Sequence, residues 1–318
     1  MTSKAKTVVV ALGGNALQRQ GEATAAAQQR VADETAQRLV PLIEKGYRIV
    51  IVHGNGPQVG NIVLHEESID TPETPTLPLD TCVAMSQGSI GYWLQQGLSD
   101  ALSQKRLPHT AVTIITQVVV DASDRAFQHP TKPIGPFYHS ELEAEHAAKE
   151  RHFTVREDAG RGWRRVVPSP RPVSVVEKDA IVTLLDSGSI VITAGGGGVP
   201  VVSTKKDGLK GIEAVIDKDF SAAVIADLIE ADSLVILTAV EAAMIDYGKP
   251  TQRAIHSIHS ATMQSYVSQG FFAAGSMLPK VQAALQFVEA KNGRRAIIAN
   301  LDDAERAISG EVGTIIHS

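Results

Sequence analysis

The chain has very little cysteine: Cys82 is the single one among its 318 residues. One thiol excludes a disulfide within the chain and a cysteine-based metal cluster, and it fits a reducing compartment. The sequence also lacks an apolar run near the ~20 residues that span a membrane, and no signal-peptide core follows its short polar start. We therefore expect a cytoplasmic protein without a membrane partner.

The chain also lacks a large excess of either charge, because its 30 basic and 35 acidic residues leave a net charge of only −5. This balance gives no general attraction to nucleic acid, so we expect small-molecule partners. Hydrophobic residues make up 43% of the chain, which is ordinary for a globular protein with a sizeable core. A chain of this length suits one large α/β domain or two smaller ones.

Glycine is abundant, and three short apolar runs lead directly into glycines. They are residues 8–12 before Gly13 and Gly14, residues 48–53 before Gly54 and Gly56, and residues 189–194 before the four glycines 195–198. Short runs of Val and Ile are typical of buried parallel strands. Glycines at the end of such a strand let a ligand approach backbone N–H groups closely. Three of them together predict a single ligand crevice.

Helical and strand-like segments alternate along the chain, which predicts a three-layer α/β/α sandwich with a mainly parallel central sheet of about eight strands. The expected helices are residues 23–45, 81–107, 178–186, 219–231, 255–269, 279–290 and 302–308. The expected strands are residues 8–12, 48–52, 111–120, 189–193, 233–240, 295–299 and 313–316.

One segment departs from this alternation. Residues 121–172 are rich in Pro, His, Arg and Glu, have few long apolar runs, and carry aromatic residues that could pack together. We expect them to form a small, protruding, lid-like subdomain inserted within a single domain that spans residues 1–318.

Two common phosphate-binding motifs do not fit the glycine segments. Residues 54–60 resemble a loose dinucleotide fingerprint, but the acidic residue that this motif requires at the end of the next strand would fall within residues 71–75. That segment reads Thr-Pro-Glu-Thr-Pro and cannot be a strand. A Walker P-loop string is absent from the sequence. Any phosphate would therefore be bound by several loops and separate lysines.

Lys218 and Lys280 each open an expected helix, the second with Pro279 at the first helical position. A lysine at a helix N-terminus opposes the macrodipole by roughly 0.3–1 kcal/mol, so two of them suggest a shared anion. Asp217 and Asp219 could orient the lysines or hold Mg²⁺. The purely structural alternative is that Asp217 caps the helix and Lys218 is solvated.

Other charged residues allow two interpretations each. Lys132, between prolines in the insertion, could bring one more positive charge over the site or be a surface lysine in a turn. The cluster of Arg161, Arg164 and Arg165 could contact a ligand or form a solvated face. His53, at a strand end, is expected to be a buried core histidine rather than a base.

Eight motifs follow one another over essentially the whole chain. They are VVALGGNAL (9–17), HGNGPQVG (53–60), QGSIGY (87–92), PTKPIG (130–135), RRVVPSP (164–170), GGGGVPV (195–201), VIDKD (215–219) and GSMLPKV (275–281). In this order they resemble carbamate kinase, of the amino acid kinase family. The resemblance implies the amino-acid-kinase fold and reversible phosphoryl transfer between carbamoyl phosphate and ADP, which yields ATP plus carbamate, hence ammonia and carbon dioxide.

The resemblance also implies Mg²⁺ with ATP or ADP as cofactor, and a cytoplasmic homodimer. Residues 1–205 would form the carbamate and phosphoryl side, and residues 206–318 the nucleotide side. A role in arginine, agmatine or purine breakdown, or in carbamoyl phosphate synthesis, would be compatible with such an enzyme.

Roles for individual residues follow from the same resemblance. Lys218 and Lys280 would contact the transferred phosphoryl group, Asp219 would orient them, and Lys132 would enter from the protruding subdomain. The expected substrate-binding residues are Gly13, Gly14, Asn15, Gly54, Asn55 and Gly56. The expected nucleotide-binding residues are Gly195, Gly196, Gly197, Asp217, Ala239, Val240, Tyr247 and Met277. No protein ligand to a metal is expected, because Mg²⁺ would be carried mainly by the nucleotide phosphates.

Two other functions stay open at this point: a relative in the same family that phosphorylates another small acid, and a catalytically silent nucleotide-binding sensor. Carbamate is already anionic at neutral pH and needs no general base. We therefore expect no dedicated His or Glu base, and catalysis mostly by positioning and charge neutralisation.

Overall fold

The computed structural model describes residues 5–19, 22–158, 160, 162–204 and 208–318. Its largest sheet has eight strands: β1 (Thr7–Leu12), β2 (Arg48–His53), β3 (Ala111–Thr113), β9 (Ile190–Thr193), β12 (Ser233–Thr238), β15 (Ser257–His259), β16 (Arg295–Asn300) and β17 (Thr314–His317). Their order is β15-β17-β16-β12-β1-β2-β9-β3, and every neighbouring pair is parallel except β16 and β17. The prediction of a mainly parallel sheet of about eight strands is confirmed.

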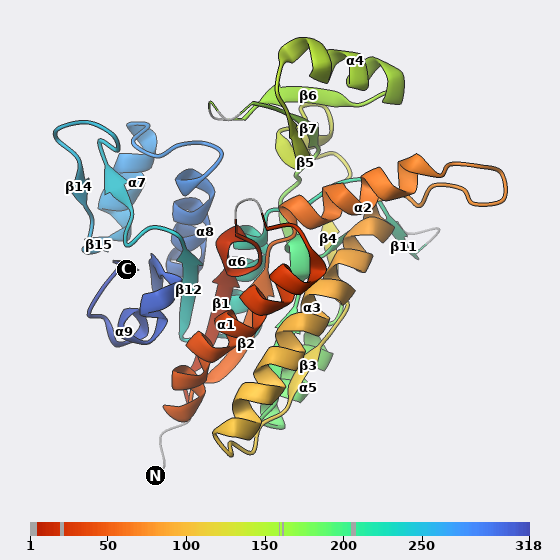
Figure 1. Ribbon diagram of the computed structural model, residues 1–318. Helices are drawn as coiled ribbons and strands as arrows, with labels where there is room; N and C mark the ends of the chain where they lie inside the picture. The colour runs from red at the N-terminus through yellow and green to blue at the C-terminus, as the bar shows by residue number, and fades with distance from the viewer. Residues whose placement is uncertain (1–4, 20–21, 159, 161, 205–207) are drawn as a thin grey trace.

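Helices cover both faces of this sheet (Figure 1). One face packs against α1 (Ala25–Glu44), α3 (Leu79–Gln104) and α9 (Ala304–Ser309). The other packs against α5 (Lys178–Asp186), α6 (Lys218–Leu228), α7 (Ser260–Ser268) and α8 (Met277–Glu289).

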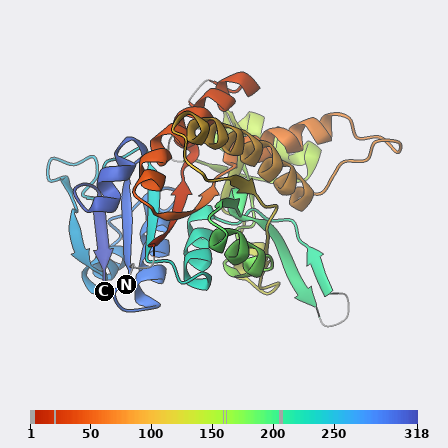
Figure 2. The ribbon, with the colours of Figure 1, turned by 90° about the horizontal axis from the view of Figure 1, so that it is seen from below.

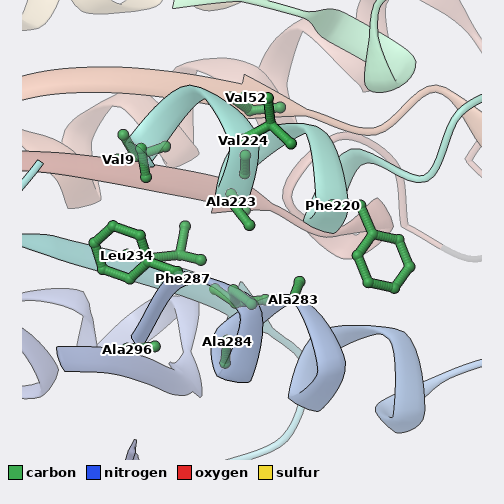
Figure 3. Close-up of a cluster of buried hydrophobic side chains, with 14 of the residues drawn as sticks. Val9, Val52, Phe220, Ala223, Val224, Leu234, Ala283, Ala284, Phe287 and Ala296 are labelled. Carbon is green, nitrogen blue, oxygen red and sulfur yellow. The ribbon is translucent and has the colours of Figure 1, made fainter. Parts of the chain in front are cut away.

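Alternate residues of each strand supply the two cores, as the two-residue period of a strand requires. In β1, Val8 and Val10 enter the core beneath α1 and α3, whereas Val9 enters the core beneath α6 and α8. Figure 3 shows Val9 in this second cluster with Val224 of α6 and Phe287 of α8. The apolar runs are continuous because both faces of the sheet are buried.

Smaller sheets surround the main one. A four-stranded sheet has the order β11-β10-β4-β8, formed by β4 (Gln117–Val120), β8 (Pro172–Val175), β10 (Val199–Thr204) and β11 (Gly208–Gly211). Figure 2 shows the antiparallel β10 and β11 projecting from the body. A two-stranded sheet pairs β13 (Met244–Ile245) with β14 (Arg253–Ala254).

A three-stranded sheet, β5-β7-β6, stands off the body together with α4 (Glu141–Arg151), above α2 (Gly56–Ser68) (Figure 1). Its strands are β5 (Lys132–Tyr138), β6 (Thr154–Glu157) and β7 (Trp163–Val167). We call these three strands and α4 the upper sheet.

Several element predictions are wrong in ways that have a physical reason. The expected strand over residues 111–120 is two strands in different sheets, because the Gln87 side chain binds both backbone polar groups of Thr116 and the chain leaves the main sheet there. Strand β10, which follows the glycines 195–198, was not anticipated either. Helix α2 was not anticipated, and residues 255–269 begin as strand β15.

Boundaries elsewhere differ by a few residues. Helix α8 begins at Met277, so Pro279 is its third residue rather than its first. Proline is still compatible with that position, since the first turn of a helix has no partners for its N–H groups. Within the described residues, no helix is both long and apolar enough to cross a membrane.

Candidate active site

A cleft of about 690 Å³ lies beside the carboxyl ends of the central strands. Gly14 follows β1, Gly54 and Gly56 follow β2, and Gly196 follows β9, so all three glycine segments of the sequence reach this cleft. Residues of the upper sheet, including Lys132, line the opposite wall. The prediction of one shared crevice is confirmed, because parallel strands place their carboxyl ends on the same edge of the sheet.

Asp219 holds two of the predicted lysines. Lys218 Nζ donates to its Oδ1 at 2.7 Å, and Lys280 Nζ donates to its Oδ2 at 2.9 Å. The carboxylate is 2% exposed; burial acts to raise its pKa, but the two ammonium groups outweigh burial and hold the pKa below its usual range. One buried carboxylate therefore fixes two ammonium groups side by side at the start of α6 and α8.

The pKa values of the two lysines shift in opposite directions. It lowers the pKa of Lys218, which is only 9% exposed, even though Asp219 acts in the opposite direction. Burial also acts to lower the pKa of Lys280, but there the charge and hydrogen bond of Asp219 prevail and the pKa is raised. The ammonium group of Lys218 is thus less fully compensated by Asp219 than that of Lys280.

Lys132 reaches the same place from the upper sheet, where its Nζ donates to Asp217 Oδ2 at 2.6 Å. Asp217 also caps α6, since its Oδ1 accepts from the backbone N–H of Asp219 at 2.9 Å. Burial acts to raise the pKa of Asp217, but Lys132 and Lys218 hold it well below the usual range. The cap prediction is confirmed, a solvated Lys218 is wrong, and Lys132 begins β5 rather than lying in a turn.

The glycine segment after β9 packs too tightly to hold side chains. A Cβ on Gly196 would overlap the side-chain amide of Asn55, and one on Gly197 would overlap the carbonyl of Ile216. Both glycines also have positive φ, at 66° and 93°. The glycine backbone is therefore in close contact with two other segments of the chain, and of these four glycines Gly196 is the one that lines the cleft.

Buried hydrogen bonds beneath this segment were not anticipated. The Thr116 hydroxyl accepts from the backbone N–H of Ala194 at 3.0 Å and lies 2.6 Å from the Thr193 hydroxyl. Gln87 of α3 binds the backbone of Thr116 with both atoms of its amide. Ala194 has a φ of 47°, unusual for a residue with a Cβ. These bonds hold the strained turn, and nothing in the local sequence around Thr116 signals them.

Two titratable residues, His53 and Cys82, are buried and do not line the cleft. His53 is 1% exposed, its Nδ1 lies 2.8 Å from the carbonyl oxygen of Gly54, and burial lowers its pKa to about 4. It is therefore neutral at pH 7, and the prediction of a core histidine is confirmed. Cys82 is buried in α3, and burial raises the pKa of its thiol to about 11.

Arg164 and Arg165 of the arginine cluster bind other parts of the chain and do not form a solvated face. Arg164 donates from Nε and Nη2 to the carbonyl oxygen of Gly135, and Arg165 Nη1 binds Glu67 of α2 at 2.6 Å. Arg164 also lines the cleft. Arg161 lies outside the described residues.

Two cations that line the cleft, Arg156 and Arg171, were missed by the sequence reasoning. The guanidinium of Arg171 lies 3.3 Å from the ring centre of Phe220 in α6, and its Nη2 donates to Gln282 of α8 at 3.2 Å. Burial lowers its pKa. Its position between two prolines gives no local signal of a place in the site.

The predicted binding residues are only partly brought together. Asn55 lines the cleft, while Gly13 lies behind it, where its N–H bonds the carbonyl of Leu237 at 3.0 Å. The structure describes the backbone of Asn15, in a short turn after β1, and its side chain lies outside the described part of the chain. The roles assigned to these three residues stay predictions.

Four of the expected nucleotide-binding residues, Ala239, Val240, Tyr247 and Met277, do not line this cleft. Tyr247 is 71% exposed near β13, Met277 begins α8, and Val240 follows β12. Ala239 lines a separate hollow of about 430 Å³. Their roles also stay predictions.

Two lysines, a capped helix N-terminus and backbone of the glycine segments line one cleft, and Lys280 is held beside it by Asp219. Among the described residues, no histidine lines the cleft. Such a site favours a multiply charged anion and can stabilise charge that develops on a transferred phosphoryl group. The three-layer fold and this site define a phosphoryl-transferring enzyme of the α/β class.

Comparisons with known proteins specify that class further. The model of the amino acid kinase family matches residues 6–300. The chain is 49% identical over 313 residues to carbamate kinase 1 of Enterococcus faecium, covering 98% of this chain and 99% of the relative. It is 51% identical over 312 residues to the carbamate kinase of Lentilactobacillus hilgardii, covering 98% and 97%.

A solved structure shows the same architecture. Carbamate kinase from Giardia lamblia bound to AMP-PNP superposes with a TM-score of 0.89 at 42% sequence identity, covering 98% of each chain. The chain belongs to the amino acid kinase family and, within it, to the carbamate kinases. The resemblance found in the sequence motifs is confirmed.

Proposed function

We propose that this protein transfers a phosphoryl group reversibly between carbamoyl phosphate and ADP, forming ATP and carbamate, which breaks down to ammonia and carbon dioxide. The observation that carries the proposal is the pair of ammonium groups that Asp219 holds beside the cleft, at 2.7 and 2.9 Å. The carbamate kinases at about half identity and the AMP-PNP complex of the Giardia enzyme support it.

In this proposal the reaction needs charge neutralisation rather than proton transfer. Lys218 and Lys280 contact the oxygens of the phosphoryl group in flight, and Asp219 keeps their geometry constant. Lys132 exchanges Asp217 for the phosphoryl group and adds a third positive charge from the opposite wall. Carbamate attacks through an oxygen that is already anionic, so the neutral His53 behind the cleft has no proton to remove.

The two sides of the site divide between the two ends of the chain. The carbamate lies against the glycine segments after β1 and β2, within residues 1–205. The nucleotide lies against Gly195 to Gly197 and against the part of the chain formed by residues 206–318. Residues 121–172 form the lid-like subdomain that presents Lys132.

Magnesium enters this proposal with the nucleotide. Both oxygens of Asp219 and both oxygens of Asp217 accept hydrogen bonds from lysines or from backbone N–H. Neither carboxylate therefore fits as a direct ligand in this arrangement. Among the described residues, no group of three or more His, Cys, Asp or Glu side chains could hold a metal ion. Mg²⁺ on the nucleotide phosphates would neutralise charge there.

The proposal is tested by measuring ATP formed from ADP and carbamoyl phosphate with purified protein, in a coupled assay. Lys280→Met should lower the rate by about 10²–10³ while the protein stays folded. Lys105→Met, a change to an exposed lysine paired with Glu44, should leave the rate unchanged. Binding of ATP without turnover would instead indicate a silent sensor, and turnover only with another small acid would indicate a different kinase.

A homodimer, implied by the resemblance, completes the proposal. Analytical ultracentrifugation at several protein concentrations measures it directly, and a sedimentation coefficient that corresponds to one chain at all concentrations would contradict it.

A further inference from the structure

Two glycines meet where the upper sheet contacts helix α2 of the body. Gly60 of α2 faces Gly135 of β5 so closely that a Cβ on Gly60 would overlap the backbone N and Cα of Gly135 and lie 3.1 Å from the carbonyl carbon of Ile134. Carbon atoms in contact rest at roughly 3.5 Å or more. The atoms that would be displaced are backbone, so no rotation of a side chain could relieve the overlap.

Gly135 is also fixed from its other side. Its carbonyl oxygen accepts from Arg164 Nε at 2.9 Å and from Nη2 at 2.6 Å. Its φ is +72°, and the pairing of β5 with β7 shifts register between Ile134 and Tyr138. Ile134 is buried in a small core with Val59 and Val63 of α2. Gly135 therefore cannot retreat from α2 unless β5 moves with it.

Lys132 lies on the same strand, three residues before Gly135. Strand β5 is paired with β7 on both sides of Pro133: Lys132 lies opposite Val167, and Ile134 lies opposite Arg165. From β5, the Lys132 side chain crosses to Asp217 at the start of α6, where Nζ and Oδ2 are 2.6 Å apart. The height of β5 above α2 thus sets how far the Lys132 ammonium group extends into the cleft.

The geometry points to Gly60 as a positioning residue for Lys132: its bare Cα lets β5 approach α2 closely enough for the ammonium group to reach the phosphoryl site. This inference rests on the proposed function, because Lys132 matters only where a transferred phosphoryl group needs its charge. Gly60 itself contacts no reacting atom.

The test compares two glycine-to-alanine changes within helices. Gly60→Ala should push β5 away from α2 by on the order of 1 Å, and a displacement of that size should lower kcat by about 10². Gly88→Ala, in α3, is the matched control, because a Cβ there meets no atom within 4 Å. The control should keep the kcat of the unmodified protein, and near-UV circular dichroism should show both variants folded.

A double-mutant cycle separates positioning from a general loss of structure. In a Lys132→Met background, Gly60→Ala should change kcat by less than about twofold, because the group that it displaces is already absent. Independent reductions that multiply in the double mutant would overturn the inference, as would a Gly60→Ala variant with unchanged kcat.

If Gly60→Ala does not fold, Ile134→Ala replaces it, because that change loosens the packing of β5 on α2 without altering the lining of the cleft, and it is subject to the same cycle with Lys132→Met. Unmodified protein that makes no ATP from carbamoyl phosphate and ADP would refute the proposed function instead. Active unmodified protein with multiplying reductions would refute only the role of Gly60.

Discussion

The cleft has two walls that hold their lysines in different ways. On the body, Lys218 and Lys280 share the buried Asp219, and all three side chains begin on helices that pack against the main sheet. On the upper sheet, Lys132 meets Asp217 across the cleft, with side chains that are 27% and 18% exposed. The upper sheet has little core of its own, since Ala144 is the single buried residue of α4.

This difference shows two ways of placing a charge. The body uses a buried carboxylate, so the positions of its lysines are coupled to the stability of the fold. The upper sheet uses a partly exposed ion pair, in which a phosphoryl group could replace Asp217 as the partner of Lys132. Substitutions on the body should therefore lower both stability and activity, and substitutions on the upper sheet should lower activity almost alone.

Asp219→Asn should give the largest effect. The change keeps the shape of the side chain but leaves Lys218 and Lys280 as buried charges without their carboxylate, at a cost of about 3–5 kcal/mol in the free energy of unfolding. With both lysines displaced, kcat should fall by about 10³. Urea unfolding and the ATP assay measure the two quantities. Loss of activity at unchanged stability would remove the distinction between the walls.

Lys132→Met should give the next largest effect on activity. Loss of one well-placed charge should lower kcat by about 10². The free energy of unfolding should fall by about 1 kcal/mol, because the pair is partly exposed and Asp217 keeps its bond from the backbone N–H of Asp219. Lys149→Met, an exposed lysine on α4 outside the cleft, is the matched control and should change neither quantity. A destabilisation as large as that of Asp219→Asn would contradict the comparison.

Thr116→Val tests how rigidly the body holds its glycine segment. Valine keeps the volume but leaves the buried N–H of Ala194 without its acceptor, which should lower the free energy of unfolding by about 1–3 kcal/mol. Thr116→Ser keeps the hydroxyl and should recover most of this stability. Thermal unfolding of the two variants measures the difference, and equal stabilities would show that the hydroxyl does not hold the turn.

The smallest effect concerns pH. The pKa of Asp217 in the folded protein is below its unfolded value of about 3.9, so its ion pair with Lys132 contributes stability above that pH. This contribution is lost as the pH falls through the folded-state pKa. The gap of about 1 kcal/mol between the unmodified protein and Lys132→Met should therefore begin to narrow below about pH 4 and narrow further as the pH approaches the folded-state pKa of Asp217.

Urea unfolding at a series of pH values from 7 to 2 measures this gap. A gap that widens toward low pH would show that Lys132 stabilises the fold by some means other than Asp217.

Much of the fold was predictable because it follows from local patterns. The glycine-ended apolar runs predicted β1, β2 and β9 and their shared edge, since two-sided burial demands continuous Val and Ile. The failures occurred where a distant side chain decided the outcome. Gln87 divides residues 111–120 into two strands, and no pattern within those ten residues contains that information.

The residues of the candidate site also fall into those that the local sequence indicates and those that it does not. Lysines at helix starts are locally unfavourable, so Lys218 and Lys280 could be selected from the sequence. Arg171, Thr116 and Gly60 could not, because their roles arise from atoms on other elements: a Phe220 ring, an Ala194 amide and the Gly135 backbone.

The sequence by itself determined which charges and which glycines this protein has for binding phosphate, and its motifs identified the family. Only the tertiary structure decided their partners, since Lys132 meets an aspartate 85 positions away and Lys280 meets one 61 positions away. The physical reason is that a buried charge must find its counter-charge wherever packing brings one. That choice depends on the distances between folded elements, and local sequence does not encode them.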